Sequence, residues 1–200
     1  MKVDDIEKTL KIKFKNRDLL LQSLTHKSYD KYLNNEKLEF LGDRVLGFVI
    51  AKKLLELYPD EKEGILDKKL ASLVNKNICF EVGKNLKLHD YIQVGKQNSD
   101  KSSIQNKIIS DACEALIGAV YLDKGFEYTE KFVLKIWKNF ISNSKILEID
   151  PKTKLQEYSL KKYKSLPVYK LISNTGPRHK PNFKVAVKIK NYDYIEATGN

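Results

Sequence analysis

The 200-residue chain has few cysteines, no long apolar run and no apolar N-terminus, and each absence excludes a class of protein. Cys79 and Cys113 stand far apart, without a Cys-x-x-Cys or Cys/His pairing, which excludes a disulfide scaffold and a zinc finger. No stretch approaches the roughly 18 apolar residues of a membrane span. The first residues are charged where a signal peptide would be apolar. The sequence therefore predicts a soluble cytoplasmic protein that does not span a membrane.

Positive charge is plentiful and unevenly distributed. The chain has 37 Lys and Arg against 26 Asp and Glu, a net charge of +11. Residues 149–200 hold 11 of the basic and 4 of the acidic residues, a net charge of +7, which leaves +4 for residues 1–148. Such an excess favours a polyanionic partner, either nucleic acid or an anionic membrane face.

Apolar residues recur every three or four positions through the first three quarters of the chain, which predicts consecutive amphipathic helices. Asn16 is the predicted N-cap of the first, and Gly125 the predicted C-cap of the fourth. Pro59 ends the second. Gly42 and Gly118, inside predicted helices, indicate that another backbone approaches closely. After the helix that begins at Asn16, helices are expected over residues 35–58, 64–86, 104–122 and 127–142, with a polar loop over 98–103.

The pattern changes near residue 149. Asp150 and Pro151 are a typical cap and first residue of a helix, expected over 152–164. Apolar residues then alternate with polar ones over 183–189, with Ala186 on the lysine-rich face, which predicts a half-buried strand. Neighbouring strands are expected over 168–173 and 194–198. We therefore predict an all-α domain over residues 1–148 and a small α+β domain, in the order α-β-β-β, over residues 149–200.

Acidic residues form two groups at helical spacing. Glu36, Glu39 and Asp43 follow one another at i, i+3 and i+7, so they fall within one stripe of a helix. Asp111 and Glu114 stand at i and i+3 in a second, largely apolar helix. Burying carboxylates is unfavourable unless a cation satisfies them. Oxygen ligands without His or Cys indicate Mg²⁺ or Mn²⁺ rather than zinc.

The spacing leaves a second interpretation open. Acidic residues recur three or four apart on most surface helices, where they are solvated and pair with nearby lysines such as Lys37 or Lys107. The spacing also does not show that the two helices face each other.

The residues around the first acidic group resemble the signature of ribonuclease III, with Lys37 where the family usually has Arg. The resemblance covers nearly the whole chain, because further stretches agree in order and spacing and residues 150–158 resemble the start of a double-stranded-RNA-binding domain. It implies an all-α ribonuclease III-type endonuclease domain followed by a small α+β RNA-binding domain. The matching stretches are residues 35–43, 24–29, 73–75 and 111–119.

The resemblance also implies roles for individual residues. Asp43 and Glu114 would be catalytic, and Glu36 and Glu63 would be supporting acids near the scissile strand. Phe40 would insert across a dimer interface. The metal-binding acids would be Glu39, Asp43, Asp111 and Glu114.

The implied activity is Mg²⁺-dependent hydrolysis of double-stranded RNA, with Mn²⁺ as a substitute ion. The products would carry 5′-phosphates and 3′-hydroxyls with short 3′ overhangs, in the processing of rRNA and other RNA. The implied enzyme is a homodimer without a membrane partner or an organic cofactor. The alternative is a non-cleaving double-stranded-RNA-binding or ribosome-associated protein on the same fold; retention of all four acids favours the enzyme.

Two features of the RNA-binding part follow from the same resemblance. RNA contacts are implied for Gln156 and Glu157 on the helix, and for Arg178, His179 and Lys180 in the loop between the first two strands. The sequence departs from the family where it stops at residue 200, before the usual lysine pair and final helix, so we expect a truncated domain. The loop over 99–103 lacks the usual glycine pair and arginine, for which Lys96, Lys101 and Lys107 would substitute as phosphate contacts unless they are ordinary surface lysines.

Overall fold

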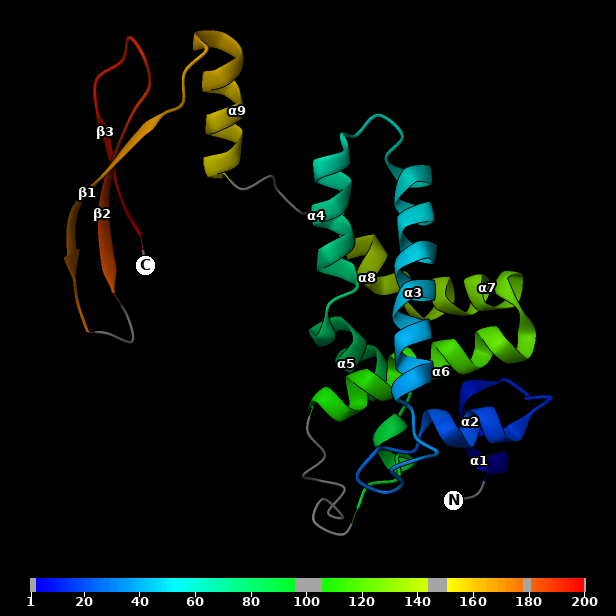
Figure 1. Ribbon diagram of the computed structural model, residues 1–200. Helices are drawn as coiled ribbons and strands as arrows, with labels where there is room; N and C mark the ends of the chain where they lie inside the picture. Colours follow the sequence, from blue (N-terminus) through cyan, green and yellow to red (C-terminus); the bar gives the residue numbers. More distant parts are fainter. Residues whose placement is uncertain (1–2, 96–105, 144–150, 178–180, 200) are drawn as a thin grey trace. The chain divides into compact units, whose positions relative to one another are not determined.

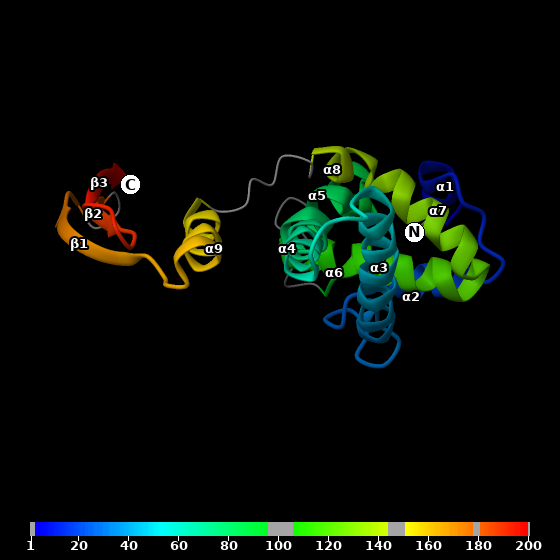
Figure 2. The ribbon, with the colours of Figure 1, turned by 90° about the horizontal axis from the view of Figure 1, so that it is seen from above.

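The structure is a computed structural model and describes residues 3–95, 106–143, 151–177 and 181–199. The chain divides into two compact units, Met1–Ile146 and Leu147–Asn200. The first unit is built from helices, and the second from one helix and three strands (Figure 1, Figure 2). The predicted order of an all-α domain and an α+β domain is confirmed. The predicted boundary at residue 148 and the loop over 98–103 lie outside the described residues.

Helix α6 (Asn106–Lys124) is the centre of the first unit (Figure 1). Every residue from 108 to 120 is buried, as expected for a helix surrounded by other helices. Within the described residues, no helix combines the length and apolarity needed to span a bilayer. In chain order the elements are α1 (Val3–Leu10), α2 (Arg17–Ser23), α3 (Glu36–Leu57), α4 (Glu63–Leu73), α5 (Lys76–Asn85), the 3-10 turn η1 (Leu88–Asp90), α6 (Asn106–Lys124), α7 (Phe126–Ile136) and α8 (Lys138–Asn143).

Two glycines allow α3 and α6 to cross in backbone contact. A Cβ atom on Gly42 would lie 1.8 Å from the carbonyl oxygen of Glu114. A Cβ atom on Gly118 would lie 2.3 Å from the carbonyl oxygen of Leu38. Both distances are far below van der Waals contact, so only glycine fits at either position. The close approach predicted from these glycines is confirmed, and it brings the acidic turns of the two helices together.

Two expectations about the helices are wrong, and one helix was missed. The helix expected over 64–86 is two helices, because Asn75 interrupts it and caps α5 by accepting hydrogen bonds from the amides of Asn77 and Ile78. The helix expected over 127–142 is interrupted at Trp137, whose buried indole donates to the carbonyl oxygen of Leu73. Helix α1 was not predicted. The apolar spacing continues across both interruptions because the segments on either side pack against one core.

The second unit is a helix followed by an antiparallel sheet in the order β1 (Val168–Thr175), β2 (Asn182–Lys188), β3 (Ile195–Gly199). The half-buried strand expected here is confirmed as β2, but the placement of Ala186 on its polar face is wrong. Ala186, expected on the polar face, is the most buried residue of the strand at 3% exposure, while Val185 and Val187 remain partly exposed. Ala186 pairs with Lys170 and Glu196, so its methyl group stands between two long side chains. The elements are α9 (Pro151–Tyr163), β1 (Val168–Thr175), β2 (Asn182–Lys188) and β3 (Ile195–Gly199).

Candidate metal centre

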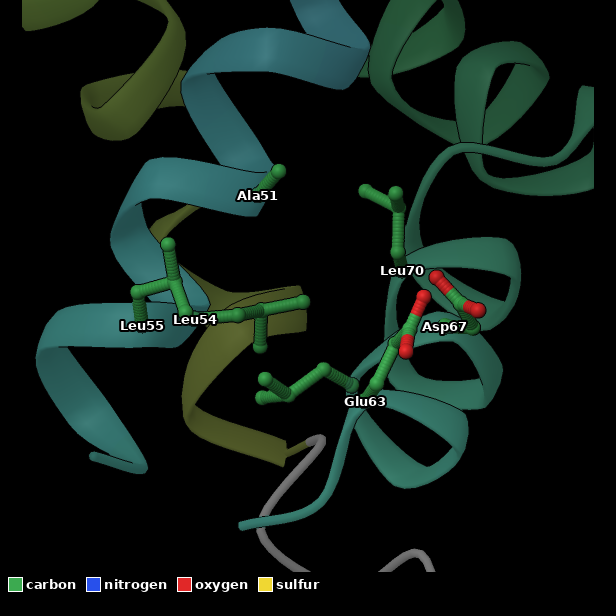
Figure 3. A pocket seen from close by; sticks show the side chains of 7 residues that line it. Ala51, Leu54, Leu55, Glu63, Asp67 and Leu70 are labelled. Carbon is green, nitrogen blue, oxygen red and sulfur yellow. The ribbon is translucent and has the colours of Figure 1, made fainter. Parts of the chain in front are cut away.

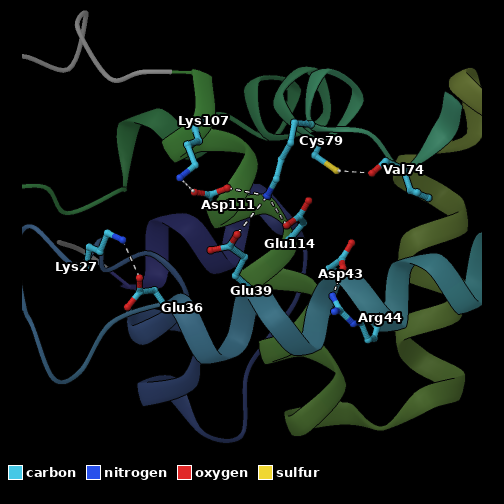
Figure 4. A network of polar contacts seen from close by, with 11 residues as sticks. Lys27, Glu36, Glu39, Asp43, Arg44, Val74, Cys79, Lys107, Asp111 and Glu114 are labelled. Atoms are coloured by element: carbon cyan, nitrogen blue, oxygen red, sulfur yellow. Dashed lines mark hydrogen bonds and ion pairs between the residues drawn. The ribbon is translucent and has the colours of Figure 1, made fainter. Parts of the chain in front are cut away.

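Three acidic side chains converge beside the crossing of α3 and α6 (Figure 4). One carboxylate oxygen from each of Glu39, Asp111 and Glu114 lies within 4.8 Å of the other two. Asp111 and Glu114 stand three residues apart on α6 and therefore point to the same side of that helix. Glu39 comes from the first turn of α3. The two acidic groups found in the sequence thus belong to one cluster.

A lysine from a third helix holds this cluster together. The Nζ atom of Lys76 lies 2.8 Å from Asp111 Oδ1, 2.9 Å from Glu114 Oε2 and 3.2 Å from Glu39 Oε1. Lys76 is the first residue of α5, so the turn capped by Asn75 directs it toward the acids. Lys76 was not predicted from the sequence, because it is remote in sequence from both acidic groups. The available signal was its position directly after the matching stretch 73–75.

Burial and the ammonium group act on these acids in opposite directions. Burial raises the pKa of Glu114, which is 2% exposed, although the hydrogen bond from Lys76 opposes this shift. Burial and then the charge of Asp111 raise the pKa of Glu39. For Lys76, burial alone would lower the pKa, but the bonds to Asp111 and Glu114 outweigh it and raise the pKa. Three carboxylates share one ammonium at close range, so the cluster retains negative charge for a further cation.

The other predicted acids lie outside this group of three. The carboxylate of Asp43 is turned to Arg44 (Figure 4). Glu36 accepts a 2.9 Å hydrogen bond from Lys27, which lowers the pKa of Glu36. Asp43 and Glu36 nevertheless border the same open depression as the cluster. Its lining residues are Glu36, Glu39, Phe40, Asp43, Arg44, Lys76 and Glu114.

Glu63 is remote from the cluster within one chain. It is the first residue of α4, near the end of α3 opposite to Glu36 (Figure 1). Together with Asp67 it borders an apolar groove between α3 and α4 (Figure 3). Apolar side chains of both helices make up the rest of the lining: Ala51, Leu54, Leu55, Leu66 and Leu70.

An apolar stripe follows the exposed side of α3. Phe40 is 64% exposed, with the guanidinium carbon of Arg44 4.6 Å from its ring centroid. Phe48 and Leu55 are also more than half exposed on the same helix. Large side chains exposed in a row are typical of an interaction surface. The position of Phe40 is compatible with the interface role that the resemblance implies.

The residues predicted to contact RNA are described only in part. Gln156 and Glu157 lie on α9, where Glu157 is exposed and Gln156 is half-buried. Arg178, His179 and Lys180 lie outside the described residues, as do Lys96 and Lys101. Lys107 is exposed, and its Nζ atom lies 3.9 Å from Asp111 Oδ2.

Comparisons with known proteins agree with both units. The family described as Ribonuclease-III-like matches residues 16–140, and the double-stranded RNA binding motif matches residues 151–200. The protein named Ribonuclease 3 of Pelagibacter ubique (strain HTCC1062) is 62% identical over 194 residues, which cover 97% of this chain and 87% of that protein. Ribonuclease 3 of Aliarcobacter butzleri (strain RM4018) is 38% identical over 197 residues, covering 97% of this chain and 88% of the relative.

Solved structures also resemble the chain. The nuclease domain of ribonuclease III from Campylobacter jejuni has a TM-score of 0.66 at 37% identity, covering 69% of this chain and 97% of that domain. That structure is described as showing flexibility in a region involved in dimer formation. Dicer from Pichia stipitis has a TM-score of 0.53 at 19% identity, covering 92% of this chain and 86% of that one, which is a likeness of fold.

Proposed function

Because this chain belongs to the ribonuclease III family, we propose that it is an endonuclease that hydrolyses phosphodiester bonds of double-stranded RNA. The observation that carries the proposal is the convergence of Glu39, Asp111 and Glu114, two of which border an open depression. A buried acidic cluster with excess negative charge has no evident use in packing, but it suits a cation that contacts a phosphate.

The donor set fits a hard divalent cation, and we assign it Mg²⁺ with Mn²⁺ as a substitute. The ligands would be Glu39, Asp43, Asp111 and Glu114, of which Asp43 borders the same depression as Glu39 and Glu114. When bound, such an ion activates the attacking water and stabilises charge on the phosphate oxygens. Asp43 and Glu114 are assigned the catalytic role. The products would be 5′-phosphate and 3′-hydroxyl ends with short 3′ overhangs.

The second unit is the proposed clamp for the RNA duplex. Double-stranded RNA exposes its 2′-hydroxyls in a wide, shallow minor groove, which proteins recognise by shape. Gln156 and Glu157 on α9 are assigned to that groove. A second contact, with the next minor groove of the duplex, is assigned to Arg178, His179 and Lys180. The net charge of +7 over residues 149–200 supports binding to phosphates.

A homodimer is the proposed assembly, in which each copy cuts one strand. The exposed apolar stripe of α3, which includes Phe40, and the adjoining groove between α3 and α4 would contact the second copy. The supporting acids Glu36 and Glu63 lie near opposite ends of α3 within one chain. We propose that pairing brings Glu63 of one copy to the RNA held by the other. The proposed compartment is the cytoplasm, and the proposed work is processing of rRNA and other transcripts.

A cleavage assay tests the proposal. A long end-labelled RNA duplex is incubated with the purified chain in Mg²⁺ or in EDTA, beside a single-stranded RNA of the same sequence. We expect fragments with 5′-phosphates from the duplex in Mg²⁺ and from neither sample in EDTA. Binding of the duplex without cleavage in either Mg²⁺ or Mn²⁺ would instead support the alternative of a non-cleaving RNA-binding protein.

A further inference from the structure

The position of Lys76 suggests a role that the proposed chemistry does not require. We propose that Lys76 is a built-in counter-cation, which holds the acidic cluster together without metal and competes with the divalent ion for the same carboxylates. The inference rests on the proposed metal centre. It predicts that one side chain both stabilises the metal-free protein and weakens metal binding.

The contacts of Lys76 are those expected of a cation in the cluster. Its ammonium group lies 2.8 to 3.2 Å from one oxygen of Asp111, Glu114 and Glu39. These are the same three acids whose oxygens lie within 4.8 Å of one another. Mg²⁺ binds carboxylate oxygens at about 2.1 Å, so an ion on this set would lie within a few ångströms of the ammonium and repel it. The divalent ion and the ammonium group of Lys76 therefore weaken each other's binding to the three carboxylates.

The structure also shows how the ammonium can leave. The side chain of Lys76 is 52% exposed, so Nζ can move into solvent without entering the core. The start of α5 does not depend on that side chain, because Asn75 caps the helix through the amides of Asn77 and Ile78. Displacement of the ammonium is therefore a side-chain movement on a fixed backbone.

Loss of Lys76 would have a different effect from loss of a nearby charge. Glu114 is almost fully buried, and removal of its ammonium partner would leave a buried carboxylate without that hydrogen bond. Lys107 provides the contrast, because it is 72% exposed and its Nζ atom lies 3.9 Å from Asp111. Both lysines carry the same charge near the same acid, and Lys76 alone of the two contacts all three acids of the cluster.

The test compares two variants of the full chain, Lys76→Met and the matched control Lys107→Met. The dissociation constant for Mn²⁺ is measured from the electron paramagnetic resonance of the free ion, and thermal unfolding is recorded in EDTA and in excess Mn²⁺. We expect Lys76→Met to bind Mn²⁺ about tenfold more tightly, the factor that corresponds to a hydrogen bond between charged groups. We also expect its midpoint in EDTA to fall by about 5 °C and to recover in Mn²⁺. Lys107→Met should change the dissociation constant by less than about twofold.

Each outcome decides the question. Equal or weaker Mn²⁺ binding by Lys76→Met would overturn the proposal, since a lysine that only supports the fold or assists the metal gives that result. Lys76→Met could be unfolded in EDTA. If so, folding of this variant when Mn²⁺ is added supports the proposal. A variant that stays unfolded in Mn²⁺ contradicts it. Lys76→Gln, which keeps a hydrogen-bond donor, then supplies the dissociation constant. A failure of the metal centre itself would give a different result. In that case, Glu114→Gln would bind Mn²⁺ no more weakly than the wild type does.

Discussion

Gly42 of α3 and Gly118 of α6 meet at the helix crossing, where a Cβ atom on Gly42 would lie 2.9 Å from the amide nitrogen of Gly118. The crossing places Glu39, on the turn before Gly42, beside Glu114, on the turn before Gly118. The two glycines thus set the separation of the carboxylates, although neither has a side chain in the site. Packing and catalysis depend on the same backbone contact.

Gly118→Ala should therefore lower both stability and cleavage. The added methyl group meets the carbonyl oxygen of Leu38, which is backbone and cannot turn aside, so the helices must separate. We expect a loss of about 3 kcal/mol in the free energy of unfolding, at the upper end for overpacking. Urea titration followed by circular dichroism measures it.

Gly47→Ala is the matched control on α3. In the described structure no heavy atom lies within 4 Å of a Cβ built on Gly47, so alanine should stabilise the helix by about 1 kcal/mol. If Gly118→Ala has the same free energy of unfolding as the wild type, α3 and α6 lie farther apart at the crossing than the structure indicates.

Glu114→Gln should abolish cleavage and leave duplex binding nearly unchanged. The amide keeps the shape of the carboxylate but removes the negative charge that a cation needs, and the proposed phosphate contacts lie elsewhere. Asp43→Asn should behave in the same way. Cleavage of labelled duplex and a gel-shift titration are measured on the same preparation.

Glu56→Gln, in the last turn of α3 and paired with Lys53, is the control and should cleave normally. Undiminished cutting by Glu114→Gln would remove Glu114 from the proposed metal centre.

Much of the fold and site follows from local patterns in the sequence, and what was missed depends on contacts between distant segments. Spacing of three residues places Asp111 and Glu114 on one face of a helix, whatever packs against it. Their contact with Glu39 depends on which helix crosses α6. The spacing of residues within a helix does not predict that. Lys76 belongs to neither acidic group, and only the turn at Asn75 brings it to them.

The wrong prediction for β2 has a similar origin. Alternation identified the strand, but it assigned Ala186 to the basic face because Lys184 and Lys188 stand two positions before and after it. Its burial depends on Lys170 and Glu196, which flank it on the neighbouring strands. A pattern with period two reports the face of a strand and not the length of the side chains across it.

Deletion of residues 151–200 should weaken duplex binding and flatten its dependence on salt. Each phosphate contact adds to the slope of log affinity against log salt concentration, and residues 149–200 hold 11 of the 37 basic residues and a net charge of +7. Dissociation constants at several KCl concentrations give the slope for both chains. Circular dichroism checks that the shortened chain keeps its helices. An unchanged slope would show that the second unit contributes no phosphate contacts.

Phe40→Ala should dissociate the proposed dimer without destabilising the monomer. Its ring is largely exposed within one chain, so its removal leaves no cavity there, whereas a buried aromatic at an interface contributes about 2 kcal/mol or more. Sedimentation equilibrium should show a dissociation constant at least about tenfold higher. The control is Tyr32→Ala, which removes a more exposed aromatic outside the α3 stripe. A dimer of unchanged strength would exclude Phe40 from the interface.

Asp123→Asn should destabilise the first unit in a way that depends on pH. The carboxylate of Asp123, 1% exposed, accepts hydrogen bonds of 2.9 and 2.7 Å from the amides of Lys15 and Asn16 and pairs with Lys124. Burial alone would raise the pKa of Asp123, but these bonds outweigh it and lower the pKa below its ordinary 3.8. The stabilisation is therefore complete above about pH 4 and is lost as the pH falls through the lowered pKa. At pH 7 the variant should lose about 2 kcal/mol, since its amide nitrogen replaces one of the two accepting oxygens and cannot accept that bond.

Urea unfolding of wild type and Asp123→Asn, repeated from pH 7 down to pH 3, measures this dependence. The difference in free energy should stay constant to about pH 4 and then shrink, because protonation deprives the wild type of the same charge. Asp60→Asn, at an exposed turn, should show a difference near zero at every pH. A gap between wild type and Asp123→Asn that persists unchanged to pH 3 would mean that shape and packing, and not the charge of Asp123, join the N-terminal segment to α6.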